Sequence, residues 1–170
     1  MQYISASLIV CLLIAIVGCG DSRAQALTRS LHYDEMEVFS IVDFETPGST
    51  SFELSIDSIP KGGDKWAPYI YYALQQGSAE NSFRLFLIRN EPDEGLIAGA
   101  EFYKNGESVF RNALITEVPL KGKVKFSLSW TKEGIFKYSV MGGAEQTLES
   151  GFSHFNAIIH MSNATASFYP

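Results

Sequence analysis

Apolar and polar residues alternate along most of the chain beyond residue 36. In SFELSIDSI, residues 51–59, the apolar Phe52, Leu54 and Ile56 alternate with polar residues. KVKFSLSW, residues 123–130, alternates in the same way. A period of two places the apolar side chains on one face of a β-strand. This part of the chain is therefore expected to consist mainly of strands that are buried on one face.

Turn-forming segments separate these alternating stretches. They include TPGS, PKGGD, NEPDEG and MGGAE, which are rich in the residues that turns favour. Asn105-Gly106 lies between two alternating segments and predicts a type I′ hairpin. No sustained helical period appears, so the pattern predicts an all-β antiparallel sandwich or barrel. The expected strands cover residues 38–44, 51–59, 68–75, 82–90, 96–104, 107–114, 123–130, 136–140, 155–162 and 166–169.

The second half of the chain has a recognisable order of strand and turn residues. In VKFSLSWTKEGIFKYSVMGG, a strand ends in Trp130, a tight turn contains Gly134, and the next strand carries Tyr138 before Gly142-Gly143. This order resembles the concanavalin A-like lectin/glucanase and laminin-G-like jelly rolls. FNAIIHMSNATASF resembles the closing strand of those domains, which returns beside the first. The resemblance implies an antiparallel two-sheet jelly-roll sandwich with a lectin-like function.

The catalytic signatures of related enzymes are missing. The Glu-x-Asp-x-x-Glu motif of glucanases with this fold does not occur, nor does the Gln-Ile-His motif of the alginate lyases. No catalytic residue is therefore assigned.

The N-terminus carries an apolar run of ten residues, Leu8 to Val17. A membrane-spanning helix needs ~20 such residues, whereas the core of a secretory signal needs ~7–15. The tetrad Ile16-Val17-Gly18-Cys19 resembles the lipobox of bacterial lipoproteins. That resemblance implies cleavage before Cys19, and attachment of lipid to its thiol. The expected organisation is a signal peptide at 1–18, a lipidated cysteine and tether at 19–35, and a β-sandwich at 36–170.

Two alternatives remain for this segment. Ala24-Gln25-Ala26 fits an A-x-A cleavage site that would release a soluble protein starting at Leu27. An uncleaved anchor helix is the other, and the short apolar run disfavours it. The lipoprotein interpretation predicts the bacterial cell envelope, with the membrane as partner through Cys19. Because Gly20, and not Asp, follows the cysteine, resemblance to enteric lipoproteins favours the outer membrane.

Charge and cysteine content narrow the partners. The net charge is −6, from 13 Lys and Arg against 19 Asp and Glu. An acidic chain without a basic cluster disfavours nucleic acid as a partner. Once the signal is removed, Cys19 is the remaining cysteine of two, so disulfides and thiolate metal sites are not expected. The three histidines lack metal-ligand spacing, and neither a metal nor a cofactor is expected.

The densest aromatic group lies in WAPYIYYAL, residues 66–74. On an alternating strand, Tyr69 and Tyr71 face away from the side that carries Ile70 and Tyr72. Trp66 lies just before the strand. Exposed planar rings suit the apolar faces of sugars, although packing in a core or at a sheet edge is the alternative.

Arg84, Glu101, Tyr103 and Arg111 are expected on the same sheet face. Glu101 and Tyr103 alternate with apolar neighbours, and Arg111 follows across the predicted hairpin. An arginine beside a carboxylate and a tyrosine suits an acidic sugar, whereas cross-strand surface ion pairs are the alternative. His160 lies opposite the apolar side of its strand and receives no role. The candidate ligand-binding residues are Trp66, Tyr69, Tyr71, Arg84, Glu101, Tyr103 and Arg111.

These patterns predict a lipid-anchored envelope protein whose lectin-like sandwich binds a glycan, such as a polysaccharide, or an envelope protein. One alternative is a degenerate polysaccharide lyase or hydrolase built on Glu101, Tyr103 and an arginine. The other is a purely structural envelope lipoprotein.

Overall fold

The computed structural model describes residues 26–32, 35–44, 47–60, 67–89, 95–152 and 154–170. The twelve strands within these ranges form two six-stranded sheets. Every strand pair in both sheets is antiparallel.

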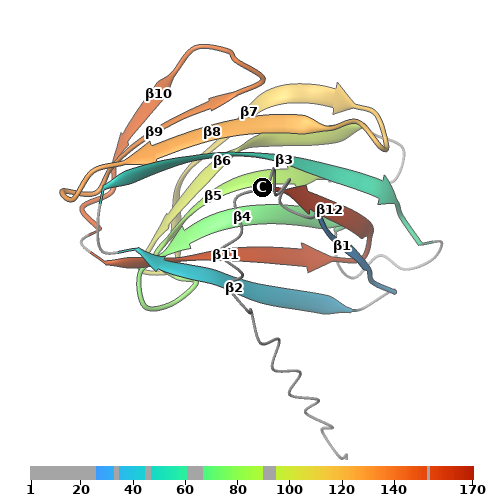
Figure 1. Cartoon of the computed structure of the whole chain (residues 1–170), viewed down its shortest axis with the longest axis horizontal. Coiled ribbons are helices and arrows are strands. Elements are labelled where there is room, and N and C mark those ends of the chain that lie inside the picture. The colour runs from blue at the N-terminus through green and yellow to red at the C-terminus, as the bar shows by residue number, and fades with distance from the viewer. Residues whose placement is uncertain (1–25, 33–34, 45–46, 61–66, 90–94, 153) are drawn as a thin grey trace, which may run out of the picture.

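The first sheet has the order β1-β12-β3-β8-β9-β10. Its strands are β1 (Leu27–Ser30), β12 (Thr165–Tyr169), β3 (Gly48–Ser58), β8 (Val124–Trp130), β9 (Ile135–Val140) and β10 (Gln146–Glu149). The second sheet has the order β2-β11-β4-β5-β6-β7. Its strands are β2 (Met36–Phe44), β11 (Phe155–Ser162), β4 (Tyr69–Gln75), β5 (Ser82–Ile88), β6 (Leu96–Lys104) and β7 (Glu107–Val118). In Figure 1 this second sheet runs from β2 at the bottom of the view to β7 near the top.

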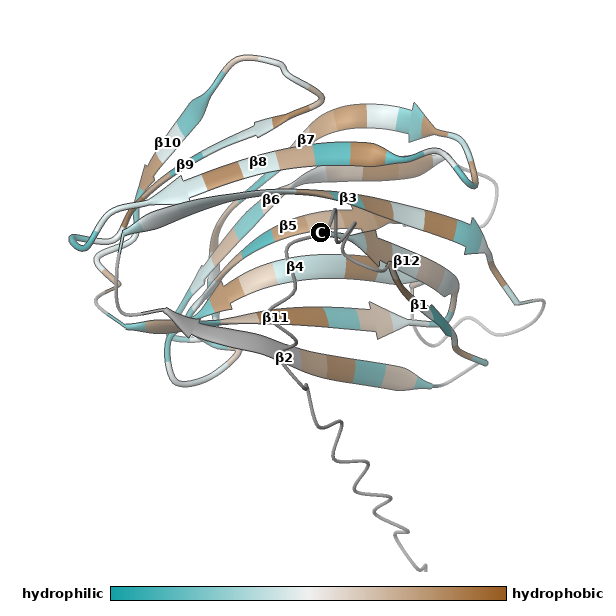
Figure 2. Cartoon of the chain, viewed as in Figure 1, coloured by the Kyte–Doolittle hydropathy of each residue, from teal (hydrophilic) through white to brown (hydrophobic). Residues whose placement is uncertain are grey.

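The core lies between the inner faces of the two sheets. Apolar and polar residues alternate along the strands, as the colours of Figure 2 show. Leu54 of β3, Phe126 of β8 and Leu85 of β5 are fully buried. Phe52 stacks on Tyr72 across the two sheets, with ring centroids 4.5 Å apart. Aromatic rings supply much of the buried apolar area that stabilises the domain.

The antiparallel two-sheet sandwich predicted from the sequence is confirmed. The Asn105-Gly106 hairpin is confirmed as well, because these residues have φ angles of 55° and 82°, both in the left-handed region that a type I′ turn requires. The closing segment returns as expected, since β11 pairs with β2 and β12 pairs with β1.

Two short strands were not predicted. β10 and β1 have four residues each, too few for an alternating pattern to stand out. β1 lies inside the segment expected to be a tether, and it pairs with β12 from Leu27 opposite Phe168 to Ser30 opposite Thr165. Leu27 packs against the core. The ordered part of the sandwich therefore includes residues that precede the expected boundary at residue 36.

The described residues contain no helix long and apolar enough to cross a membrane. The signal segment and Cys19 lie outside the described residues, so their processing stays a prediction.

Candidate functional site

The outer face of the second sheet gathers most of the candidate residues. Strand register places Tyr71 opposite Phe86, and Arg84 opposite Glu101. Glu101 is in turn opposite Arg111 on β7. Because side chains alternate between faces, residues in these registers point away from the core. This outer-face cluster consists of Tyr69 and Tyr71 on β4, Arg84 and Phe86 on β5, Glu101 and Tyr103 on β6, Arg111 on β7, and His160 on β11.

Four of these side chains form a diagonal stack across three strands. The rings of Tyr69 and Tyr71 are nearly parallel, at 13°, with centroids 5.4 Å apart. The guanidinium carbon of Arg84 lies 5.1 Å from the centroid of Tyr71 and 4.1 Å from that of Tyr103. Arg84 lies opposite Ala73, which is two residues after Tyr71 on β4. Tyr69 is two residues before Tyr71 on the same strand. The two faces of the Tyr71 ring are therefore covered by Tyr69 and Arg84.

The stack changes what the tyrosines offer to a ligand. Stacking of a sugar needs an open ring face, and the Tyr71 faces are occupied. The stack instead presents ring edges, phenol hydroxyls and guanidinium N–H groups. Hydrogen bonding and charge are consequently its main means of recognition.

His160 joins the two tyrosines of the stack. Its Nδ1 is hydrogen-bonded to the Tyr71 hydroxyl, and its Nε2 lies 3.2 Å from the Tyr69 hydroxyl. The imidazole meets both phenol rings edge-on, at 88° to Tyr69 and 77° to Tyr71. β11 supplies this histidine because it pairs with β4, which places His160 directly opposite Tyr71.

This hydrogen-bond chain continues beyond the imidazole. The Tyr69 hydroxyl is also bonded to Ser162, whose hydroxyl donates to the backbone carbonyl of Glu35 at 3.3 Å. A neutral imidazole has one donor and one acceptor nitrogen, so His160 donates to one of the two phenol oxygens and accepts from the other hydroxyl. With either tautomer, the Tyr71 oxygen keeps a lone pair that can accept a hydrogen bond from a ligand.

Burial fixes the protonation states of this chain. It raises the pKa of Tyr69 to about 12, with a further contribution from Tyr71. Burial also raises the pKa of Tyr71. For His160, burial and then the charge of Arg84 lower the pKa to about 4. At neutral pH the cluster therefore contains neutral phenols and a neutral imidazole beside a charged guanidinium.

Arg84 is held in place with part of its donor capacity left over. Its Nε donates to the Ser82 hydroxyl at 2.9 Å, and Nη2 donates to the Ala79 carbonyl at 3.0 Å. Nη1 lies 3.9 Å from Glu101 Oε2, which is too long for a direct hydrogen bond. The side chain is only 18% exposed. A guanidinium has five N–H hydrogens, so these contacts leave several available.

Glu101 and Tyr103 form the edge of the cluster next to Arg84. Glu101 is buried, and it is hydrogen-bonded to the Tyr103 hydroxyl. Burial and then this bond raise the pKa of Tyr103. On the described outward positions of β11, β4, β5 and β6, Glu101 is the one carboxylate.

Phe86 lies beside the stack and is covered by Arg111. The Arg111 guanidinium carbon is 5.3 Å from the Phe86 ring centroid. Gly99 makes room for this ring, because a Cβ there would come within 2.8 Å of Phe86 Cζ and 2.2 Å of the Asn112 carbonyl oxygen. Phe86 is therefore buried although it lies on the outer face.

Six of the seven candidate ligand-binding residues lie together on this face: Tyr69, Tyr71, Arg84, Glu101, Tyr103 and Arg111. Trp66 lies outside the described residues, and its role stays a prediction. The sequence analysis missed His160 and Phe86 as members of the cluster. Its alternating pattern did place His160 away from the core, but the pairing of β11 with β4 was not visible in the sequence.

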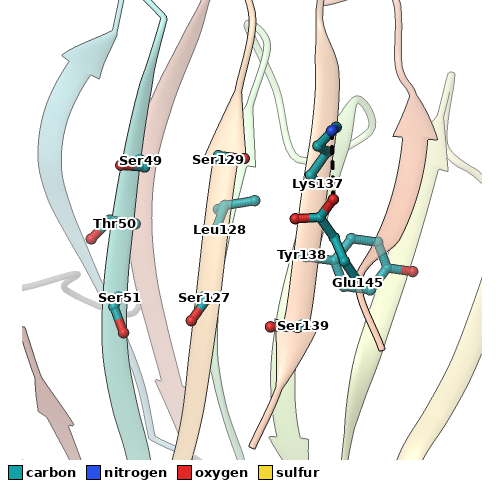
Figure 3. A pocket seen from close by; sticks show the side chains of 10 residues that line it. All are labelled: Ser49, Thr50, Ser51, Ser127, Leu128, Ser129, Lys137, Tyr138, Ser139 and Glu145. Carbon is teal, nitrogen blue, oxygen red and sulfur yellow. Dashed lines mark ion pairs between the residues drawn. The ribbon is translucent and has the colours of Figure 1, made fainter. Parts of the chain in front are cut away.

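A second feature lies on the outer face of the first sheet. It is a hollow of about 350 Å³. Three neighbouring strands contribute serines to its lining (Figure 3). A Lys137–Glu145 ion pair of 3.5 Å lies at its side. The hollow is lined by Ser49, Thr50, Ser51, Ser127, Leu128, Ser129, Lys137, Tyr138, Ser139 and Glu145. Its lining consists mainly of small hydroxyl side chains and contains no aromatic cluster.

Within the described part of the chain, no group of three or more His, Cys, Asp or Glu side chains is placed to hold a metal ion.

At the level of sequence, no protein-family profile matches the chain and no curated protein is detectably similar to it. Solved structures are similar in fold. A carbohydrate-binding module, CBM66 from Bacillus subtilis, aligns with a TM-score of 0.56 and 11% identity, over 84% of this chain and 91% of that one. Chicken galectin 2 aligns with a TM-score of 0.50 and 12% identity, over 77% and 95%. An alginate lyase from Pseudomonas aeruginosa aligns with a TM-score of 0.52 and 10% identity, over 74% and 62%. The chain thus has the lectin-like jelly-roll fold that carbohydrate-binding modules, galectins and an alginate lyase share.

Proposed function

We propose that this chain is a glycan-binding module, and that the outer-face cluster of the second sheet is its binding site. The observation that carries the proposal is the fixed arrangement of phenols, guanidinium and imidazole on one face. Their side chains are oriented by hydrogen bonds before any ligand arrives, which reduces the entropy cost of binding. Proteins with this fold include a carbohydrate-binding module and a galectin, and this supports the same class of ligand here.

The site suits a sugar because it combines donors and acceptors at short range. The Tyr71 oxygen accepts, Arg84 donates, and Glu101 accepts. A pyranose carries several hydroxyls that are both donors and acceptors, so it can satisfy such a set. The half-buried ring of Tyr103 provides apolar contact beside the polar groups.

A glycan screen tests this proposal. The chain from Gly20 to Pro170, which retains all twelve described strands, is passed over immobilised polysaccharides. Tyr103→Ala is expected to weaken retention about tenfold, which corresponds to the loss of about 1.4 kcal/mol of binding free energy. Its matched control is Ser127→Ala in the hollow of the opposite sheet, which is expected to leave retention unchanged. Retention that depends on Ser127 and not on Tyr103 would place the site in the hollow and contradict the proposal.

We also propose that the domain is anchored by lipid on Cys19 in the cell envelope, in the outer membrane. The support is the resemblance of residues 16–19 to a lipobox, directly after an apolar run of signal-peptide length. The anchor would hold the glycan-binding face close to the cell surface.

A degenerate lyase or hydrolase is a second candidate, since Glu101, Tyr103 and Arg84 are in contact. Two features weigh against it. Hydrolysis commonly uses a pair of carboxyl groups, and Glu101 has no carboxylate partner at the described outward positions of β11, β4, β5 and β6. The raised pKa values of Tyr69, Tyr71 and Tyr103 disfavour a phenolate base. Release of reducing ends or unsaturated sugars that Tyr103→Phe abolishes would establish the enzyme instead.

A purely structural role would be favoured by a large exposed apolar patch. The exposed large apolar residues of the described part of the chain are spread over separate elements, apart from Met36 and Val38 on β2.

A further inference from the structure

We infer that the outer-face cluster recognises an anionic group, a carboxylate or a sulfate, on the glycan, and that Arg84 is the residue that binds it. This inference rests on the proposed function and names the class of ligand.

The first argument is the incomplete neutralisation of Arg84. Its side chain is 18% exposed, and its ion-pair partner Glu101 is 3.9 Å away. Close charged hydrogen bonds between N⁺–H and O⁻ are about 2.7–2.9 Å long. Withdrawing a charge from water is costly unless an opposite charge approaches closely. Arg84 therefore keeps N–H groups that its hydrogen bonds to Ser82 and Ala79 do not use, and these can donate to an anion.

The second argument is the rigidity of the guanidinium. Ser82, itself buried, accepts from Nε and donates its own hydrogen to the Ala79 carbonyl. The same carbonyl accepts from Nη2. The rings of Tyr71 and Tyr103 cover the guanidinium. The group is fixed, and Nη1 makes no direct hydrogen bond to Glu101, which lies 3.9 Å away. A planar anion can take two hydrogen bonds from a fixed guanidinium edge.

The third argument is the local charge. The cluster contains Arg84 and Arg111 against Glu101, a balance of 2 − 1 = +1. The whole chain carries −6. The charged side chains of the cluster thus have a positive balance on an acidic protein, which favours an anionic ligand there.

The neighbouring acceptors define the rest of the ligand. Beside its hydrogen bond to His160, the Tyr71 oxygen keeps a lone pair that can accept a hydrogen bond. The expected ligand therefore carries a hydroxyl, as a donor to Tyr71, near the anionic group. A uronic acid and a sulfated sugar both meet this requirement.

Matched polysaccharides test the inference with the chain from Gly20 to Pro170. Polygalacturonate is compared with the same polymer after methyl esterification, which removes the charge and keeps the sugar. Dextran sulfate is compared with dextran. Dissociation constants are measured by calorimetry at low and high salt. At least one anionic polymer is expected to bind about tenfold or more tightly than its neutral counterpart, and added salt is expected to reduce the difference. Which polymer shows the effect identifies the carboxylate or the sulfate as the recognised group.

Variants connect the effect to the site. Arg84→Gln is expected to remove the preference for the anionic polymer, and the exposed Arg111→Gln to reduce it. Lys125→Gln, on the outer face of the other sheet, makes the same charge change and is expected to leave the preference within about twofold. Circular dichroism and thermal unfolding verify that each variant is folded. If Arg84→Gln does not fold, the inference is still tested by the comparison of esterified with free polymer and by the Arg111→Gln result.

Two outcomes overturn the inference separately from the proposed function. Equal binding of the charged and neutral polymers, lost in Tyr103→Ala, would keep the glycan-binding function and reject the anion. A preference that survives both arginine substitutions would reject Arg84 as the contact. Failure to bind any polysaccharide would reject both proposals together.

Discussion

At the residue scale, the fold places His160 in the outer-face cluster, where it is hydrogen-bonded to two tyrosines. The sequence shows only that it alternates with apolar neighbours on its strand. The structure surrounds it with Tyr69 and Tyr71, within reach of the charge of Arg84. Its environment excludes the protonated form, because burial and a nearby cation both oppose a second positive charge.

This environment predicts a dependence of stability on pH. The pKa of His160 falls from about 6.5 in the unfolded chain to about 4 in the folded one. Between these values the unfolded state binds a proton that the folded state does not, so the free energy of unfolding falls as pH falls. Above pH ~6.5 the residue is neutral in both states and contributes no pH dependence. Allowing for solvent screening around a half-buried ring, we expect a loss of about 1–2 kcal/mol between pH 6.5 and 4.

Urea unfolding at pH 7 and pH 4 measures this loss. His160→Gln does not titrate, whereas all other ionisable groups are shared with the wild type. The wild type is therefore expected to lose about 1–2 kcal/mol more than the variant over this interval. Parallel losses in the two proteins would show that His160 is not held neutral by the fold.

At the scale of elements, the strands of five or more residues were predicted and the two strands of four residues were not. Residues 96–104 and 155–162 were predicted with their observed bounds, because each contains several alternating positions. β1 is only four residues long, and Leu27 is its one apolar residue. A single apolar position cannot show the period of two that marks a strand. Its strand conformation depends on β12, which lies more than a hundred residues later in the chain.

β1 is expected to contribute measurably to stability. A chain that starts at Leu31 lacks the ladder to β12 and the packing of Leu27. Compared with the chain from Gly20, we expect it to lose about 2 kcal/mol of unfolding free energy, from one partly buried leucine and several hydrogen bonds. Ser30→Ala is the control, since its hydroxyl makes only an exposed bond to Thr165, and it is expected to cost less than about 0.5 kcal/mol. Unchanged urea unfolding of the shortened chain would mean that β1 is not part of the cooperative domain.

At the scale of the whole molecule, β1 also brings the domain close to the proposed lipid anchor. Seven residues, 20–26, separate Cys19 from the start of β1 at Leu27. The eight steps from Cys19 to Leu27, at 3.3–3.6 Å each, reach at most about 29 Å. A lipidated domain would therefore stay at the membrane surface, within reach of glycans on that surface.

Labelling with palmitate tests the anchor. The wild type is expected to incorporate the label and to fractionate with membranes. Cys19→Ala is expected to incorporate none, because the thiol that accepts the lipid is gone. Cys11→Ala is the matched control and is expected to keep the label, since Cys11 lies within the apolar run and would be removed with the proposed signal peptide. Label retained by Cys19→Ala would contradict the lipoprotein assignment.

The sequence by itself determined the fold class, because a period of two is a local property that each strand carries independently. It also determined which residues face away from the core, and so supplied six members of the cluster. Only the tertiary structure decided how these residues meet. Strand pairing brings His160 to Tyr71 and stacks Arg84 between two tyrosines, so that ring faces expected to be open are covered. Register between strands that are distant in the chain is set by the packing of both sheets on one core, and no local pattern contains that information.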